Sequence, residues 1–113
     1  MSSKLLSISK NQDFKSILTG KKISNRYVTI FFKNLSGKSN KNLNISFIAQ
    51  KKLGNAILRN KIKRRLKNIM NQINKILKIN LNYSYLMISK KTIINAKFID
   101  IKNMLLNDCK KIR

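Results

Sequence analysis

Residues 55–77 read NAILRNKIKRRLKNIMNQINKIL, a pattern that predicts a long amphipathic helix. Its apolar residues recur every three or four positions and so share one face: Leu58, Ile62, Leu66, Ile69, Ile73 and Ile76. The remaining arc is basic. Residues four apart lie about 40° apart around a helix, so Arg59, Lys63 and Lys67 form one ridge. We therefore expect one face of this helix to join a core and the other to bind anions.

The composition of the chain indicates a polyanionic partner. Among 113 residues there are 26 Lys and Arg against 3 Asp and Glu, which gives a formal net charge of +23. Repulsion on that scale opposes compaction unless anions neutralise it. Three arginines, Arg59, Arg64 and Arg65, fall within the predicted helix, and a guanidinium grips phosphate with a planar fork that lysine lacks. A nucleic acid is the expected partner.

Groups suited to protein catalysis are scarce in this sequence. It has no His, no Glu and only three acids, Asp13, Asp100 and Asp108. A P-loop, a GxGxxG motif and a CxxC pair are all absent, and the single Cys109 forms neither a disulfide within the chain nor a metal-ligand pair. We expect no catalytic residue and no metal ligand in the protein. No long apolar segment or signal peptide is visible, which predicts a cytoplasmic protein without a membrane partner.

The rest of the chain predicts a small α+β domain. The expected elements are a helix over 9–20, strands over 26–33, 43–50 and 83–90, and a last helix capped by Asn95. The second strand is expected to pair beside the first, across a polar loop at 34–42. The order is then α-β-β-α-β-α, a small mixed β-sheet packed with helices in one RNA-binding domain over 1–113.

Helix ends and buried faces follow from particular residues. Ser9 and Gln12 resemble a capping box for the first helix, which Gly20 can end. The apolar face of that helix holds Phe14, Ile17 and Leu18, and the buried stripe of the last helix holds Phe98, Ile101 and Leu105.

Alternation splits the strand over 26–33 into two faces. Val28, Ile30 and Phe32 point to the core, opposite Tyr27, Thr29 and Phe31. Phe31 on that second face, and Phe14 on the first helix, can each belong to a binding surface or to the core. Tyr83 and Tyr85 either extend an aromatic surface or pack.

A tight turn precedes the long helix. Gly54 tolerates positive φ, Asn55 can cap the first turn, and Lys51 and Lys52 lie close by. The free N–H groups of a helix start can bind a phosphate or a hydrated metal, although a plain cap explains the same residues.

At residues 51–68 the sequence KKLGNAILRNKIKRRLKN resembles the signature of the bacterial ribonuclease P protein component. That family has an arginine-asparagine-arginine motif, which opens a basic helix after a Lys-Lys-x-Gly-Asn turn. NQDFKSIL followed by TGKKISNRYVTIFF, with its Asn25-Arg26 pair, is similar to the family's first helix and first strand. The resemblance covers residues 8 to 109 and is most specific over 51–68.

The resemblance implies a non-catalytic protein subunit of a ribonucleoprotein endoribonuclease that processes tRNA. Its partners would be the ribonuclease P catalytic RNA and precursor tRNA, with no further protein required. The RNA, with magnesium bound through it, would cleave the 5′ leader and leave the mature tRNA end. The family sheet has a strand beyond those predicted above, and the sheet face and the first helix form an open cleft.

Two groups of site residues are implied. RNA binding falls to Lys51, Lys52, Asn55, Arg59, Asn60, Lys61, Lys63, Arg64, Arg65 and Lys67. The leader-binding cleft falls to Phe14, Leu18, Arg26 and Phe31. Lys61 departs from the family where its second motif arginine is usual, which keeps the charge but loses the fork. Leu18 stands where an aromatic ring is common, which weakens stacking on bases.

Two other classes of protein compete with this interpretation. A ribosomal or other structural RNA-binding protein would share the charge and the missing catalytic groups, but it needs no Gly-Asn turn before its arginines. A membrane-active cationic helix would share the amphipathic pattern. Against that class, the flanking strands predict a folded domain that buries the apolar stripe.

Overall fold

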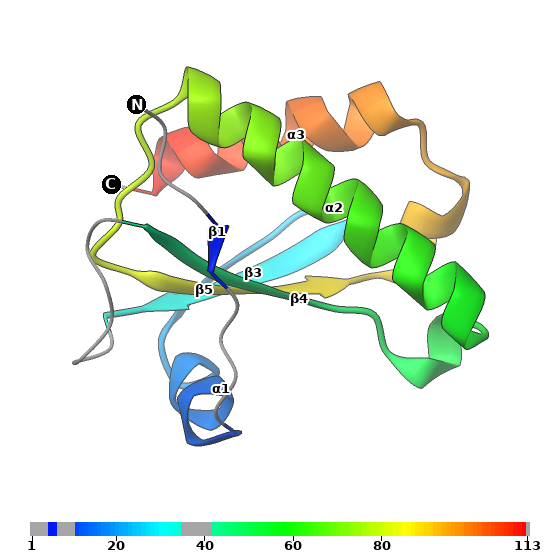
Figure 1. The fold of residues 1–113 in the computed structure, drawn as a ribbon, viewed down its shortest axis with the longest axis horizontal. Coiled ribbons are helices and arrows are strands. Elements are labelled where there is room, and N and C mark those ends of the chain that lie inside the picture. Colours follow the sequence, from blue (N-terminus) through cyan, green and yellow to red (C-terminus); the bar gives the residue numbers. More distant parts are fainter. Residues whose placement is uncertain (1–4, 7–10, 35–41, 113) are drawn as a thin grey trace.

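The computed structural model describes residues 5–6, 11–34 and 42–112, which form a five-stranded mixed sheet in the order β1-β4-β5-β3-β2 (Figure 1). The strands are β1 (Leu5–Leu6), β2 (Lys21–Ser24), β3 (Val28–Lys33), β4 (Leu43–Ile48) and β5 (Ser84–Ser89). The helices are α1 (Asn11–Ile17), α2 (Ala56–Ile76) and α3 (Phe98–Lys111), with short 3-10 helices η1 (Lys51–Leu53) and η2 (Lys91–Asn95). This agrees with the predicted α+β class.

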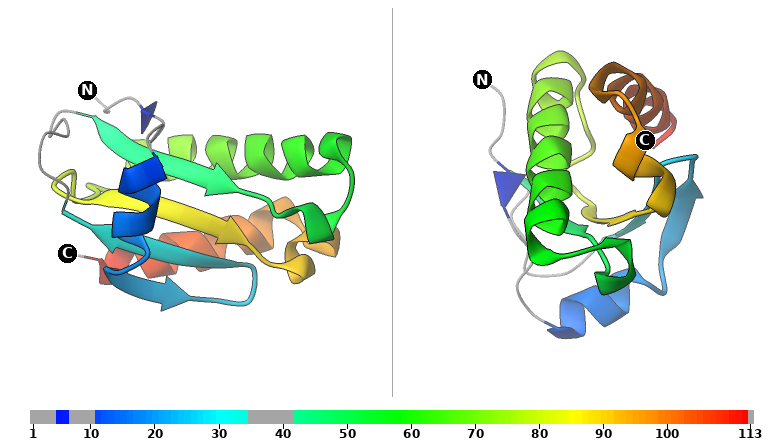
Figure 2. Two further views of the ribbon diagram at one scale, coloured as in Figure 1. Left: turned by 90° about the horizontal axis from the view of Figure 1, so that it is seen from below. Right: turned by 90° about the vertical axis from the view of Figure 1, so that its right-hand side faces the viewer.

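The two faces of the sheet are covered unequally. Helices α2 and α3 lie side by side on one face, and α1 crosses the other (Figure 2). The main core lies under α2 and α3 and includes Ile30, Leu66, Ile69, Ile73, Met87, Ile101 and Leu105. On the α1 side the fully buried apolar residues are Ile17 and Leu86, with Phe14, Phe31, Ile48 and Ile88 packed against them. A small cluster therefore fixes α1 to a face that is otherwise lightly covered.

Helix α2 matches its prediction closely. Asn55 is its N-cap, and Asn55 Oδ1 accepts a hydrogen bond of 2.9 Å from the Leu58 amide. Gly54 before it has a φ of 149°, and a Cβ there would lie 2.7 Å from Leu58 Cδ2, so the turn requires glycine.

None of the helices in the described part of the chain is long and apolar enough to cross a membrane.

The apolar stripe of α2 is buried along most of its length. Its fully covered members are Ile62, Leu66, Ile69, Met70 and Ile73. The prediction was wrong for Ile76, which is 67% exposed. The chain leaves the helix at that point, and the half-buried Leu77 and the buried Ile79 cover the core instead.

The strand order corrects one expectation. Strand β4 does not pair with β3; β5 lies between them, antiparallel to β3 and parallel to β4. Parallel neighbours need a long crossover connection, which α2 supplies on its way from β4 to β5. The hairpin partner of β3 is β2, an element that the sequence pattern did not predict, as is the two-residue β1.

Two helix ends also differ from the predictions. Helix α3 has Lys97 as its N-cap, and Asn95 belongs to η2, because the chain makes a 3-10 turn before the helix starts. Ser9 of the predicted capping box lies outside the described residues. Gly20 follows α1 as expected, but for a steric reason: a Cβ there would lie 2.6 Å from Phe32 O. Glycine lets the end of α1 approach β3.

Strand β3 divides as predicted, with one exception. Val28, Ile30 and Phe32 join the main core and Phe31 faces α1, but Tyr27 is 8% exposed and also packs in the main core. The other two tyrosines pack as well. The Tyr83 ring meets Phe32 edge-on at 5.2 Å, and the Tyr85 hydroxyl donates to Asn80 O at 2.6 Å.

Candidate nucleic-acid interface

The basic surface of α2 has a centre and two flanks. Asn60, Lys61, Arg64 and Lys67 are exposed, whereas Arg59, Lys63 and Arg65 are half-buried. At 100° per residue Arg65 lies about 200° from Lys63, so these two residues border opposite sides of the exposed arc. The predicted RNA-binding residues are thus brought together on one helix, but they do not all face one surface.

A groove of about 360 Å³ joins one flank of α2 to the α1 side of the molecule. It is lined by Phe14, Ser46, Phe47, Ile48, Lys63, Arg64 and Lys67. We call it the first groove. Within the described residues β1 pairs with Leu43 and Asn44, so the later part of β4 is an edge of the sheet without a neighbouring strand. The groove passes around that edge, which brings an aromatic ring of α1 together with three cations of α2.

A second groove, of about 390 Å³, lies at the far end of β5. Its lining residues are Thr29, Gln50, Lys52, Leu53, Ile88, Ser89, Lys90 and Lys91. Ile88 pairs in register with Ile48 of the first groove on one side and with Thr29 on the other. The two grooves are therefore neighbours on the α1 side of the sheet, with a short apolar strip between them.

The four residues predicted for the leader cleft do not lie together. Phe14 and Phe31 pack in the same cluster around Ile17 and Leu86, half-buried, and Phe14 also lines the first groove. Phe14 is thus both a packing residue and a groove residue. Leu18 is 46% exposed and lines neither groove. Arg26 is exposed on the turn between β2 and β3.

The turn before α2 contributes less than its sequence suggested. Lys51 and Lys52 are exposed on η1, and Lys52 lines the second groove. Asn55 is exposed, and its side-chain oxygen is occupied as the helix cap. Within the described part of the chain, no three acidic, cysteine or histidine side chains gather as a metal site would require. The plain-cap interpretation of Asn55 accounts for its geometry.

Some residues of the grooves were missed by sequence reasoning. The β4 edge at Ser46–Ile48 could be found only once the strand order was known, and the same holds for Thr29 and Lys91. Arg59 adds a feature that no pattern indicates. Its Nε is buried and has no hydrogen-bond partner among the described residues, which leaves one guanidinium donor without an acceptor.

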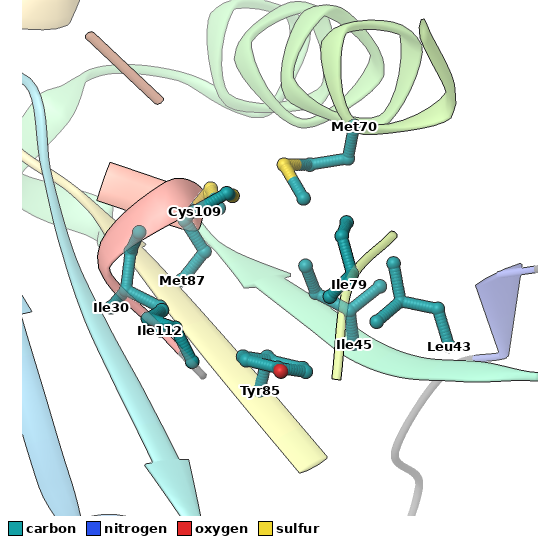
Figure 3. A pocket seen from close by; sticks show the side chains of 9 residues that line it. All are labelled: Ile30, Leu43, Ile45, Met70, Ile79, Tyr85, Met87, Cys109 and Ile112. Carbon is teal, nitrogen blue, oxygen red and sulfur yellow. The ribbon is translucent and has the colours of Figure 1, made fainter. Parts of the chain in front are cut away.

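The interior pocket belongs to the core. Figure 3 shows the side chains that line it, among them Met70 of α2, Cys109 and Ile112 at the end of α3, and Ile30, Tyr85 and Met87 of the sheet. The cavity among these side chains is about 10 Å³, roughly the minimum needed for one water molecule. Burial, with a smaller contribution from Asp108, raises the pKa of the Cys109 thiol to about 12. Cys109 is therefore a packing residue and a poor nucleophile.

Comparison with known proteins identifies one family. The Ribonuclease P family model matches residues 3–113. The ribonuclease P protein component of Listeria monocytogenes is 30% identical over 101 residues, which cover 88% of this chain and 82% of the relative. That of Mycoplasma mycoides is 30% identical over 107 residues, 94% of each chain.

Solved structures agree in fold. The RNase P protein of Staphylococcus aureus superposes with a TM-score of 0.76 at 27% identity, over 93% of this chain and 92% of that one. The RNase P protein of Thermotoga maritima has the same fold, with a TM-score of 0.80 at 23% identity over 96% and 98% of the two chains.

The buried thiol generates a prediction about reactivity and pH. At pH 8 a free cysteine with a pKa near 9 is about one-tenth thiolate, whereas a thiol with a pKa near 12 is about one part in ten thousand. Native Cys109 should resist a disulfide reagent that labels the protein promptly in denaturant.

The same shift makes stability depend on pH. A raised folded-state pKa stabilises the fold below the unfolded value, near 9, and that contribution is lost as the pH rises toward 12. Between pH 8 and 10 the wild type should lose more unfolding free energy than Cys109→Ala. Prompt labelling of the native protein, or equal losses, would contradict the burial of this thiol.

Proposed function

This chain belongs to the ribonuclease P protein family, and from that premise we propose that its basic helix and its grooves bind two different RNAs. The family supplies the protein component of an RNA-dependent endoribonuclease that processes tRNA 5′ ends, so the ribonuclease P RNA is a partner of this chain. We assign the basic part of α2 that lies outside the first groove to that RNA. We assign the first groove to the single-stranded 5′ leader of precursor tRNA.

The composition of the first groove carries the leader assignment. Proteins bind single-stranded nucleic acid by stacking bases on aromatic rings while cations follow the phosphates. Phe14 supplies a ring, and Lys63, Arg64 and Lys67 supply cations, all within one groove. A base can stack on Phe14 while its phosphates reach α2.

The second groove extends the path of the strand. Ile48 and Ile88 form an apolar bridge between the grooves, and Lys52 and Lys91 are exposed at the far side. A leader that leaves Phe14 crosses this bridge and meets cations again. Phe31, half-buried near Leu86, packs on the same α1 side of the sheet.

The catalytic RNA is assigned to the other part of α2. Asn60 and Lys61 are exposed outside the first groove, and Arg65 borders the flank away from it. Arg59, half-buried on the same helix, adds a guanidinium, a group that binds phosphate through a planar fork. Repulsion among these cations is relieved when phosphates neutralise them.

The protein performs no bond cleavage in this proposal. Among the side chains that the structure describes, neither groove is lined by an acidic residue, a histidine or a cysteine. Cations and an aromatic ring position RNA but do not transfer protons near neutral pH. Magnesium therefore acts on the catalytic RNA, and the protein holds the precursor against it.

Replacing the aromatic rings by leucine tests the leader path. Phe14→Leu keeps apolar bulk against Ile17 and Leu86 but removes the ring that lines the first groove. Stacking contributes about 1 to 3 kcal/mol per base, so this variant should bind precursor tRNA at least about fivefold more weakly, with mature tRNA affinity unchanged. Phe31→Leu, in the same cluster but outside both grooves, should cause a smaller loss. The measurement is the affinity of the protein-RNA complex for both tRNAs.

Phe32→Leu is the matched control for these variants. Phe32 is 7% exposed in the main core, next to Phe31 in sequence but on the opposite face. The Phe32→Leu substitution should lower the unfolding free energy without changing the ratio of the affinities for precursor and mature tRNA. An equal loss for both tRNAs in Phe14→Leu would contradict a leader contact there.

Salt dependence tests the cations of α2. Arg64→Ala and Lys67→Ala should each remove a phosphate contact with the leader. The slope of log affinity for precursor tRNA against log salt concentration should therefore become shallower by about 1. Lys110→Ala, which removes an exposed charge from α3 instead, is the control and should keep the wild-type slope. Identical slopes in all four proteins would exclude phosphate contacts at Arg64 and Lys67.

A further inference from the structure

The turn between β2 and β3 is fastened by residues far away in the sequence. Its members are Ser24, Asn25, Arg26 and Tyr27, and the residues that hold it are Lys90, Thr92 and Asp108. Lys90 directly follows β5, Thr92 belongs to η2 and Asp108 to α3. An exposed hairpin turn does not need this many tertiary hydrogen bonds to form. We call this set of contacts the turn clamp.

The centre of the turn clamp is the pair Asn25 and Asp108. Asp108 is only 4% exposed, and its Oδ2 accepts a hydrogen bond of 2.6 Å from Asn25 Nδ2. Asn25 Oδ1 in turn accepts from the amides of Tyr27 and Val28, at 2.7 and 2.9 Å. A carboxylate cannot donate, so Asp108 fixes which way the Asn25 amide points. The turn is thereby held in a single conformation.

Lys90 and Thr92 hold the other side of the turn. Lys90 Nζ donates to Ser24 Oγ at 2.6 Å and to Asn25 O at 2.5 Å, and the Lys90 amide donates to Tyr27 O at 2.8 Å. Thr92 Oγ1 donates to Arg26 O. The ammonium of Lys90 is therefore engaged within the protein, although its side chain borders the second groove.

What the turn clamp presents to solvent is Arg26. Its neighbour Tyr27 is buried in the main core, whereas Arg26 is exposed and its guanidinium has no acceptor among the described residues. The other arginines in the described part of the chain all lie on α2. Lys90 lines the second groove and donates to Asn25 O, so the backbone of this turn lies next to the end of the path assigned to the leader.

We propose that Asn25 and Asp108 are positioning residues, which hold the turn so that Arg26, a residue the family resemblance places at the leader cleft, can grip a leader phosphate. The proposal rests on the leader path proposed above. Fixing the backbone in advance lowers the ordering cost of a contact, so a clamped arginine binds more strongly than one on a mobile turn. Asp108 acts on RNA affinity only through Arg26.

A double-mutant cycle with an exchange of the pair tests the proposal. Arg26→Ala should weaken precursor binding by about tenfold, the range of a charge-assisted hydrogen bond. Asn25→Asp places two carboxylates face to face and should produce a similar loss. In the Arg26→Ala background, Asn25→Asp should cause no further loss of affinity for precursor tRNA, because Asn25 acts only through Arg26. The combined variant Asn25→Asp with Asp108→Asn restores a donor and an acceptor and should recover wild-type affinity.

Thr92→Val keeps the test decisive if Asn25→Asp fails to fold. It removes one hydroxyl from the turn clamp at an exposed position and should weaken precursor binding, again only when Arg26 is present. Effects that add in full to that of Arg26→Ala, or wild-type binding by Arg26→Ala, would overturn the proposal. Thermal unfolding of each variant shows whether weaker binding comes from loss of the folded state or from displacement of Arg26.

Mature tRNA separates failure of this proposal from failure of the leader assignment. If the wild-type complex binds precursor and mature tRNA equally well, the leader assignment itself fails. If the wild type prefers precursor and Arg26→Ala keeps that preference in full, only the role of the turn clamp fails.

Discussion

The packing of α2 across the sheet is the interaction on which the rest of this structure depends. Burying one aliphatic side chain contributes about 1.5 to 3 kcal/mol, whereas two like charges four residues apart on a helix cost about 0.2 to 0.5 kcal/mol. Five buried residues of α2, among them Leu66 and Ile69, therefore outweigh the repulsion along the same helix. Within the described residues no ion pair engages the cations of α2, which leaves them available for phosphate.

The unequal cover of the sheet follows from this arrangement. Since α2 and α3 bury one face, the other face carries only the small cluster around Ile17 and Leu86 that fixes α1. Gly20 allows the end of α1 to approach β3, so the short helix stays close to the sheet. The second groove and the Phe14 side of the first groove lie where this second face is not covered. The surface proposed for the leader is thus the face that the main core does not require.

Sequence patterns predicted the elements that are periodic and buried. The spacing of Ile62, Leu66, Ile69 and Ile73 was sufficient for α2, and alternation was sufficient for β3 and β5. Strand β2 was missed because Lys21, Lys22 and Ser24 are exposed, so no apolar alternation marks it. The predicted pairing of β3 with β4 was also wrong, although a strand, a long helix and another strand in succession are typical of a parallel crossover.

The site could be predicted only in part. Cations on α2 were identified from helix geometry and from the family resemblance. Their grouping with Phe14 depends on β4 being an edge strand, which is a property of the whole sheet. The contact between Asn25 and Asp108 joins residues 83 positions apart, and no local pattern indicates it.

The central claim is that this protein lets a catalytic RNA cleave precursor tRNA by neutralising phosphates and holding the leader. Its most direct test is cleavage of precursor tRNA by a bacterial ribonuclease P RNA at low magnesium, with and without the protein. The account predicts cleavage at the mature 5′ end only when the protein is present, and cleavage by the RNA alone once magnesium is raised. Tight binding to the cognate RNA without any stimulation of correct cleavage would contradict it.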